Sequence, residues 1–493
     1  MSIITVYNNE EKSEFFFAPG ENLLTLLRER GFAPDAPCGG RGLCGKCKVL
    51  LDRGSGVESV LACSVVPDGD CTVRLTDSRE NLSWNDTAGG TFVQAGRSGF
   101  GAAVDLGTTT VAVSLLDLSN GRRLGSASRW NVQRSCGADV ITRISFCMEH
   151  PDGLLKLRDA IRREIEEMIE ELCAENSLPL SDVREIFLAG NTVMQHIFVG
   201  IPADSIAAAP YTPASFFDDG KPLMLGEIPV FLSPCVAGYV GGDITAGLLG
   251  AGLNEKAGRS LFIDVGTNGE MALGGADGFL SCAVASGPAF EGAGISCGMP
   301  AGKGAVNKVW LTDGGLGYEV IGGGEAKGLC GSGLLDLAAC LLELGYIDES
   351  GCLEKNEDGE AAFYLTETVY IDQRDVRQLQ LAKAAVAAGI RILLRSAELG
   401  FDELDALYLA GGFGNRLRPE SAVRIGMLPE EMLGRIKTAG NTSLAGAERA
   451  LLVPEARAAL REIKEKCGYI ELSSHKGFND CFVGEMFFPE VEQ

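Results

Sequence analysis

The chain has 493 residues, enough for two to four domains, and its hydrophobic content of 46% supports large cores. Its formal net charge of −24 argues against a nucleic-acid partner, because phosphate binding needs a basic surface. The N-terminus lacks a basic stretch followed by an apolar run, and no uncharged apolar stretch reaches ~18 residues, so we expect neither a signal peptide nor a membrane span.

The first segment predicts a small domain of strands with one helix. Apolar residues over 2–7 and 13–17 are typical of two strands. Leu residues at helical spacing favour a helix over 21–29. Two further strands are predicted at 48–51 and 71–75.

Four cysteines follow the predicted helix in the pattern C-x5-C-x2-C-x15-C, at Cys38, Cys44, Cys47 and Cys63. The plant-type [2Fe–2S] pattern, C-x4-C-x2-C with a distant fourth Cys, differs by one residue in the first gap. Glycines between them permit tight positive-φ turns around a small inorganic core. The alternative is a zinc knuckle or unrelated thiols, but zinc sites usually pair two similar half-sites. We therefore predict a [2Fe–2S] cluster that moves single electrons, in a domain that resembles the β-grasp ferredoxin fold.

The other cysteines and the histidines indicate no second site of this kind. Of the 16 Cys, those outside this set are scattered singly, and small buried hydrophobes are the favoured interpretation. With only three His, neither a His-based metal site nor Ser-His-Asp catalysis is expected. An oxygen-sensitive cluster beside many free thiols predicts a cytoplasmic location.

A polar segment without a period predicts a linker over residues 79–98, after a ferredoxin domain over residues 1–78. Beyond the linker, strands alternate with helices, which indicates an α/β architecture. Residues 103–111 resemble residues 262–270, since each has an apolar strand, an Asp-x-Gly-Thr turn and a second strand. An internal repeat of this kind predicts a duplicated fold.

The repeat extends beyond these two hairpins. Long helices predicted over 154–175 and 376–399 are each followed by a strand containing Leu-Ala-Gly, at 185–194 and 406–415. Hairpin, helix and strand therefore occur twice in the same order. The duplication predicts two similar α/β lobes that face each other across a cleft.

We assign these lobes to residues 99–250 and 251–493, the second with a C-terminal extension. In each hairpin turn, Gly lets the backbone approach a phosphate, and the turn N–H groups form an anion-binding nest. The Asp carboxylate suits Mg²⁺, which prefers oxygen ligands. Two such turns, followed by Gly411 and Gly412 where a strand ends and an adenosine could approach, favour a nucleotide site.

In these motifs the chain resembles the actin/Hsp70/sugar-kinase superfamily of nucleotide-binding proteins, whose ATPase fold is RNase H-like. The resemblance implies bound ATP and Mg²⁺, a first phosphate loop at Asp105–Thr110, a second at Asp264–Glu270 and an adenosine motif at Ala410–Asn415. The residues implied to contact the nucleotide are Gly107, Thr108, Thr109, Thr110, Asn191, Gly266, Thr267, Asn268, Gly269, Gly331, Ser332, Gly411, Gly412 and Phe413.

Three carboxylates are the main catalytic candidates. The resemblance implies that Asp105 and Asp264 act at the phosphate loops. Asp243 opens a predicted helix in a segment that resembles the connection between the lobes, where it could orient the attacking water or the metal; the alternative is a helix N-cap. Asp139 is a further candidate with the same alternative. The small-residue turn around Ser332 fits a nucleotide contact at a helix N-terminus and a tight packing turn equally well.

An N-terminal [2Fe–2S] ferredoxin joined to an actin-like ATPase resembles the reductive activators of corrinoid proteins. Some members have a further domain between the two parts, whereas here only a short linker separates Asp77 from Gly99. The motifs that carry this narrower resemblance lie at residues 131–144, 189–201, 208–213, 234–249, 263–270, 328–337, 408–417 and 440–447.

The narrower resemblance implies an enzyme for ATP-dependent reductive activation, in which one electron from the [2Fe–2S] cluster converts an inactive Co(II) corrinoid to Co(I). The implied partners are a corrinoid protein of a methyltransferase system and an upstream ferredoxin or flavoprotein, with a homodimer left open. One alternative is an ATP-driven electron donor to another low-potential radical enzyme, as in the activators of 2-hydroxyacyl-CoA dehydratases. A non-enzymatic redox or nucleotide sensor and a small-molecule kinase are the others.

Overall fold

The computed structural model describes residues 2–490 except residues 9–10, 19, 31, 33, 35, 37–39, 41, 43–45, 55, 76–95, 267, 357–358 and 415. Outside the described residues lie Cys38, Cys44, Thr267, Asn415 and most of the predicted linker. Internal contacts divide the chain into two units, one with the described residues up to Leu232 and one with those from Ser233 onward. No helix in the described ranges is long and apolar enough to cross a bilayer.

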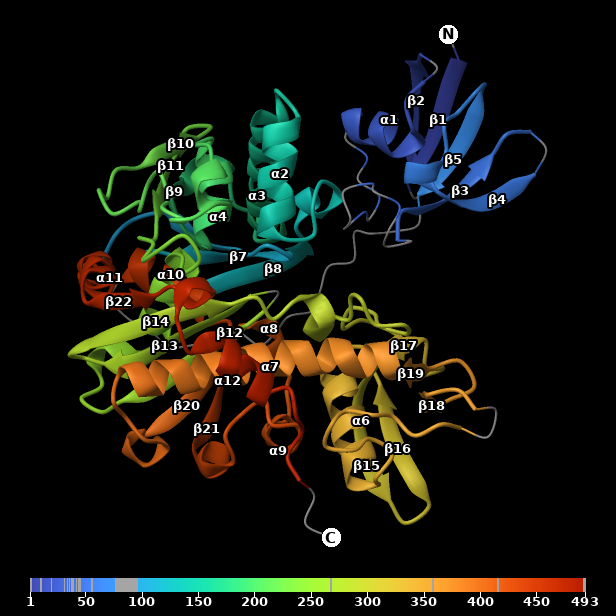
Figure 1. Ribbon diagram of the computed structural model, residues 1–493. Coiled ribbons are helices and arrows are strands. Elements are labelled where there is room, and N and C mark those ends of the chain that lie inside the picture. The colour runs from blue at the N-terminus through green and yellow to red at the C-terminus, as the bar shows by residue number, and fades with distance from the viewer. Residues whose placement is uncertain are drawn as a thin grey trace. The chain divides into compact units, whose positions relative to one another are not determined.

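The N-terminal part of the chain is a five-stranded sheet with one helix (Figure 1). Its strands are β1 (Ser2–Asn8), β2 (Glu11–Phe17), β3 (Lys48–Asp52), β4 (Val57–Leu61) and β5 (Cys71–Leu75), in the order β2-β1-β5-β3-β4. Helix α1 (Leu23–Glu29) begins after Asn22, whose side chain accepts the N–H of Thr25, and its leucines are buried in the core of this domain. Sequence analysis missed β4, because most side chains of this edge strand are exposed.

The next part is a six-stranded sheet, ordered β10-β11-β9-β6-β7-β8, with helices packed on it (Figure 1). Helix α3 lays Ile161, Ile165 and Met168 into the core that it shares with the sheet. The elements are β6 (Phe100–Leu106), β7 (Thr110–Asp117), β8 (Arg123–Trp130), α2 (Val140–Glu149), α3 (Gly153–Glu175), β9 (Val183–Gly190), α4 (Thr192–Val199), β10 (Leu223–Leu225) and β11 (Ile228–Leu232).

A second six-stranded sheet, ordered β21-β20-β12-β13-β14-β22, lies in the second unit, and the long helix α7 packs on β13 and β14 (Figure 1). Five of its strands repeat the first sheet in order and direction, since β21-β20-β12-β13-β14 matches β11-β9-β6-β7-β8. The elements are α5 (Gly242–Gly250), β12 (Ser260–Val265), β13 (Gly269–Gly275), β14 (Gly278–Val284), α7 (Gln373–Ser396), β20 (Ala406–Ala410), α8 (Gly411–Gly414), β21 (Ile436–Gly440), α10 (Thr442–Leu452) and β22 (Cys467–Ile470).

The second unit also carries smaller elements. Helix α6 packs on β15 of a three-stranded sheet, and α12 packs on α7. These elements are β15 (Ala305–Thr312), β16 (Gly315–Val320), β17 (Gly328–Leu329), α6 (Gly331–Glu343), β18 (Ala362–Tyr364), β19 (Tyr370–Asp372), α9 (Pro419–Arg424), α11 (Ala456–Glu465) and α12 (Phe478–Gly484).

The two strands with the Leu-Ala-Gly motif are shorter than predicted. Strand β9 ends at Gly190 because Asn191 caps the next helix by accepting the N–H of Met194. Strand β20 ends at Ala410 because Gly411 takes a φ of 79°, which turns the chain into α8. In both copies the predicted motif therefore marks a junction between a strand and a helix.

Candidate functional site

Two of the four predicted cluster ligands lie within the described residues, and their sulfur atoms are close together. The Sγ atoms of Cys47 and Cys63 are 3.3 Å apart, and both thiols are free of disulfides. Cys47 precedes β3 and is buried, whereas Cys63 is half-buried in the short turn after β4. The backbone ties these two segments together, because the N–H of Ala62 donates to the carbonyl oxygen of Cys47.

Two glycines between the predicted ligands, both within the described residues, have the positive φ expected of a cluster loop. Gly40 and Gly42 both have positive φ, at 92° and 75°. A Cβ on Gly40 would lie 3.1 Å from Leu24 and 3.9 Å from the Cβ of Cys63, so the loop runs close to α1 and to one ligand. A pair of adjacent thiols beside a glycine loop fits an iron–sulfur cluster.

The first predicted phosphate loop is the turn between β6 and β7, and its carbonyl groups are held by side chains. Asn131 donates from Nδ2 to the carbonyl oxygen of Gly107 at 2.8 Å, and Arg143 donates to that of Thr108. Gly107 cannot be replaced freely, because a Cβ there would lie 2.8 Å from the carbonyl oxygen of Thr110. Asp105 lies in β6, two residues before this glycine.

Asn191, which follows the neighbouring strand β9, contacts the same loop. Its Nδ2 donates to the Thr108 hydroxyl at 2.8 Å while its Oδ1 caps α4. The predicted residues Gly107, Thr108 and Asn191 thus lie together in the first unit.

Asp139 caps a helix, which was the alternative to a catalytic role. It is the N-cap of α2, and its carboxylate accepts the N–H of Thr142 at 2.7 Å in a capping box. This contact explains the Asp at that position without catalysis.

The second predicted loop brings a carboxylate against the predicted adenosine motif. Asp264 lies in β12 and pairs across the sheet with Glu270 of β13 and with Ala410 of β20. The next residue, Gly411, comes so close that a Cβ there would lie 2.2 Å from Oδ1 of Asp264. Two motifs that are far apart in the sequence therefore meet at one point of the second sheet.

Glu270 is an acidic residue that sequence analysis assigned to the loop but not to the chemistry. Burial and then the carboxylates of Asp243 and Asp264 raise the pKa of Glu270 well above its ordinary value, although Asn268 hydrogen bonds to it. The signal that could have found it is the hairpin register, which places it directly opposite Asp264.

Asp243 does not cap its helix. Helix α5 begins at Gly242 after the N-cap Gly241, so Asp243 lies inside the first turn, where its carboxylate accepts the N–H of Ile244. The N-cap alternative is therefore wrong. Its electrostatic effect on Glu270 places Asp243 in the same acidic group as Asp264.

The small-residue turn that opens α6 packs directly on the predicted adenosine motif. A Cβ on Gly331 would lie 1.9 Å from the carbonyl oxygen of Phe290 and 2.8 Å from the ring of Phe413. The two Phe rings stack at 4.9 Å between centroids and 12° between planes. The Ser332 hydroxyl donates to the carbonyl oxygen of Asn307. These contacts match the packing alternative, and they also put this turn next to Phe413.

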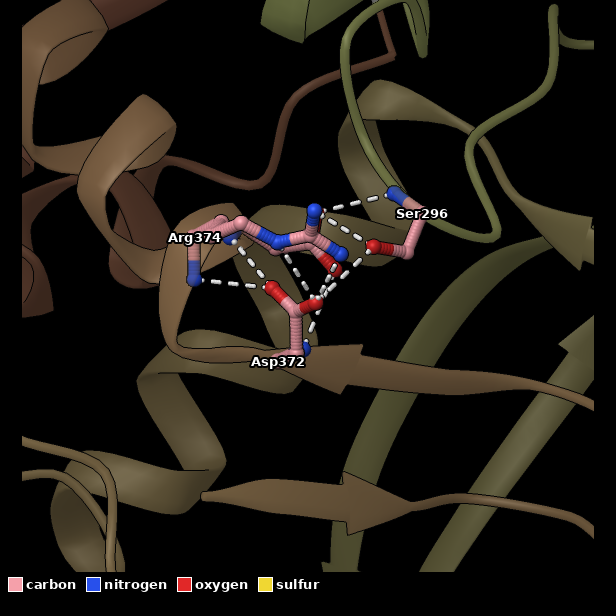
Figure 2. A network of polar contacts seen from close by, with 4 residues as sticks. Ser296, Asp372 and Arg374 are labelled. Carbon is pink, nitrogen blue, oxygen red and sulfur yellow. Dashed lines mark hydrogen bonds and ion pairs between the residues drawn. The ribbon is translucent and has the colours of Figure 1, made fainter. Parts of the chain in front are cut away.

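A buried carboxylate fixes the segment that follows Phe290. Ser296 donates from its N–H and its hydroxyl to Asp375 at 2.8 and 3.1 Å, and its hydroxyl also reaches Asp372 (Figure 2). Asp372 caps α7 and forms an ion pair with Arg374. Burial raises the pKa of Asp375 despite these donors. The network anchors the chain between β14 and β15 to the start of α7.

Comparison with known proteins confirms the predicted architecture. Three family models match: the 2Fe-2S iron-sulfur cluster binding domain over residues 6–68, the RACo middle region over 100–256, and the C-terminal domain of RACo, the ASKHA domain, over 258–493. The fold is therefore a ferredoxin-type domain followed by an actin-like ASKHA domain.

Three known proteins align with this chain over most of its length. The corrinoid activation enzyme RamQ of Eubacterium limosum is 32% identical over 422 residues, which cover 79% of this chain and 70% of that protein. The [Co(II) methylated amine-specific corrinoid protein] reductase of Methanosarcina barkeri is 26% identical over 79% of this chain and 77% of its own. A solved structure of a reductive activator for corrinoid, iron-sulfur protein aligns with a TM-score of 0.72 at 32% identity, covering 100% of this chain and 99% of its own.

Proposed function

Because the chain belongs to the RACo family of reductive activators of corrinoid proteins, we propose that it uses ATP to reduce the inactive Co(II) state of a corrinoid protein to Co(I). One observation carries the proposal: a single chain joins an iron–sulfur domain with paired thiols to a duplicated actin-like ATPase fold. If the protein were only a kinase, its iron–sulfur domain would have no function. If it were only a ferredoxin, its ATPase fold would have none.

In the electron-transfer half, Cys38, Cys44, Cys47 and Cys63 are the proposed ligands of a [2Fe–2S] cluster. When bound, this cluster supplies the single electron that cobalt accepts. Cys47 and Cys63 hold their sulfur atoms close together, and Gly40 lets the loop pass beside them. Cys47 lies in the core of the five-stranded sheet domain and Cys63 packs against that core, so this domain would hold the cluster.

In the nucleotide half, we assign the phosphates to the turns that follow Asp105 and Asp264. The proposed contacts of the first turn are the backbone and hydroxyls of 107–110 with Asn191, which already bonds to Thr108. The proposed contacts of the second are Gly266, Thr267, Asn268 and Gly269, with the adenosine beside Gly411, Gly412, Phe413, Gly331 and Ser332.

Mg²⁺ is proposed as the partner of the ATP phosphates. It usually keeps several waters and takes one or two carboxylates beside substrate phosphates. Asp105 and Asp264 are the proposed carboxylates, and Asp243 is proposed to orient the attacking water. Asp243, Asp264 and Glu270 disfavour one another's ionised forms. A nearby divalent cation would stabilise the ionised form of all three carboxylates.

The free energy needed for this reduction is of the size that a protein can supply through coupling to ATP. A tenfold change in a one-electron equilibrium corresponds to about 59 mV, so a gap of ~120 mV amounts to about 2.8 kcal/mol. Allosteric coupling free energies are typically ~1–3 kcal/mol. Coupling between nucleotide binding and electron transfer can therefore supply a drive of this size.

The remaining assignments are also proposals. The corrinoid partner belongs to a methyltransferase system, and a ferredoxin or flavoprotein reduces this protein in turn. We place the reaction in the cytoplasm and leave room for a homodimer. The short segment 79–98 is proposed to link the electron-transfer and ATPase parts.

The test is an anaerobic mixture of the full-length protein with a Co(II) corrinoid protein, a reductant and MgATP. Appearance of Co(I) absorbance that requires every component supports the proposal. Absence of Co(I) with every plausible corrinoid partner would refute it. EPR of the reduced protein separates the closest alternative, because a dehydratase activator carries a [4Fe–4S] cluster between subunits rather than a [2Fe–2S] cluster within one domain.

A further inference from the structure

Arg143 is a fully buried cation directly behind the first phosphate loop. It lies in the first turn of α2 and has an exposed fraction of 0%. Charged side chains are almost never fully buried unless they are paired. Its burial therefore calls for an explanation beyond packing.

The acceptors of this guanidinium are all uncharged. Nη2 donates to the carbonyl oxygen of Thr108, Nε to that of Gly137 at 3.1 Å, and Nη1 to Oε1 of Gln133 at 3.1 Å and Sδ of Met194 at 3.0 Å. Among the described residues, no carboxylate accepts one of these hydrogen bonds. A buried charge held only by neutral groups is expensive, and an anion nearby would offset that cost.

Two carboxylates lie close enough to raise the pKa of Arg143, but each already accepts a backbone N–H. Asp139 accepts that of Thr142, and Glu164 accepts that of Val132. Burial is the larger effect and lowers the pKa of Arg143 to about 9. The guanidinium therefore stays protonated at neutral pH, and the loop sits over a positive charge.

The contact with Thr108 also sets the direction of the loop's N–H groups. In a planar trans peptide the C=O and N–H bonds point in opposite directions. Since the carbonyl oxygen of Thr108 points to Arg143, the N–H of Thr109 is directed away from the guanidinium. The same argument applies one residue earlier, where Asn131 donates to the carbonyl oxygen of Gly107, so the N–H of Thr108 is directed away from the Asn131 amide. Successive N–H groups on one side of a loop form an anion-binding nest.

We propose that Arg143 is a positioning residue for the triphosphate: it turns the peptide N–H groups of the first phosphate loop toward the nucleotide and places a positive charge behind them. This inference deepens the proposed ATP function and rests on it. It assigns no contact between Arg143 and the nucleotide itself. Its consequence is that the contribution of Arg143 to binding grows with the number of phosphate charges.

The experiment measures the affinity of the full-length protein for MgATP, MgADP, AMP and adenosine by calorimetry, with adenosine also tested in competition. The variants are Arg143→Met, which removes the charge, and Arg143→Lys, which keeps it but offers fewer donors. Arg162→Met is the matched control, because Arg162 is also desolvated and donates to the carbonyl oxygens of Phe198 and Val199, away from the loop.

For Arg143→Met we expect MgATP affinity to fall by roughly ten- to a hundredfold, MgADP affinity to fall less, AMP affinity to change slightly and adenosine affinity to stay unchanged. Arg162→Met should match the wild type throughout. If Arg143→Met does not fold, Arg143→Lys decides, because it should lose more affinity for MgATP than for adenosine.

An equal loss for all four ligands would show a purely structural role and overturn the inference, as would an unchanged affinity for MgATP. These results differ from failure of the proposed function itself. In that case the wild-type protein would bind none of the four ligands, and the inference would fall with it.

Discussion

A methyl group on Gly411 would lie 2.2 Å from Oδ1 of Asp264, so the end of β20 and the end of β12 meet without room for a side chain. Gly411 also has a φ of 79°, which L side chains rarely adopt. The contact joins the second predicted phosphate loop to the predicted adenosine motif within one unit. Closeness of this kind would let a single nucleotide bind to both.

Gly411→Ala is therefore expected to disturb both loops. Strain at the left-handed position costs about 1–3 kcal/mol of unfolding free energy, and the clash must also displace Asp264. We expect MgATP-stimulated reduction to be lost while the iron–sulfur absorbance remains. Gly434→Ala is the control, because a Cβ at Gly434 meets nothing within 4 Å. Equal behaviour of the two variants would contradict the account.

Glu270 should give stability a measurable dependence on pH. Its pKa is raised in the folded state by burial, Asp243 and Asp264, whereas in the unfolded chain it takes the ordinary value of about 4.3. Between these two pKa values the folded state binds more protons than the unfolded state. The contribution of Glu270 to the free energy of unfolding is therefore greatest at low pH and falls as the pH rises through that window.

Glu270→Gln removes this titration and should flatten the dependence, with the largest gain in melting temperature at the alkaline end. The measurement is thermal unfolding from about pH 5 to 8, a window above the ordinary Glu pKa, without nucleotide. Glu255→Gln is the control, since Glu255 is largely exposed in an ion pair with Arg449. A gain that is the same at every pH would refute the titration of Glu270.

The thiol pair predicts which cysteines hold iron. Cys47→Ser should lose iron and visible absorbance, because Cys47 and Cys63 bring their sulfur atoms to 3.3 Å, whereas ATP binding by the separate ATPase part should persist. Cys71→Ser is matched to it as a buried thiol of the same domain outside the predicted ligand set. Intact absorbance in Cys47→Ser, or its loss in Cys71→Ser, would overturn the ligand assignment.

The network of Figure 2 predicts coupling between a buried carboxylate and the Phe290 segment. Asp375→Asn replaces one acceptor oxygen by a donor that faces the N–H and hydroxyl groups of Ser296 or the N–H of Asp372. An unsatisfied buried group of this kind costs about 1–3 kcal/mol. We expect a lower melting temperature and weaker MgATP binding, because Phe290 stacks on Phe413.

Asp219→Asn serves as the control for that variant, because Asp219 accepts a backbone N–H in an exposed turn of the other unit. Calorimetric titration with MgATP reads both variants. Unchanged nucleotide affinity in Asp375→Asn, at a temperature where the protein is folded, would separate the network from the nucleotide site.

Much of the fold could be predicted because its signals are local. The hairpins around Gly107 and Gly266 can be recognised from their apolar strands and their Asp-x-Gly-Thr turns. The repetition of this pattern predicts the matching strand order of the two sheets. The paired thiols follow from spacing in the same way. Strand β4 could not be predicted so easily, since an exposed edge strand has little apolar pattern.

The parts of the site that could not be predicted depend on contacts between distant segments. Arg143 reaches a carbonyl group 35 residues earlier in the chain, and Phe290 meets Phe413 only after the second unit has folded. The pKa of Glu270, on strand β13, is raised by burial and then by Asp243, which comes from helix α5. Residue type and spacing do not predict such contacts between distant segments.

The most direct test of the account is the yield of Co(I) as a function of MgATP, at a fixed reductant potential and with a Co(II) corrinoid protein in equal amount. The account predicts little Co(I) without nucleotide and a saturating increase with MgATP, abolished in Cys47→Ser and in Gly411→Ala. The same yield of Co(I) at every MgATP concentration would contradict it.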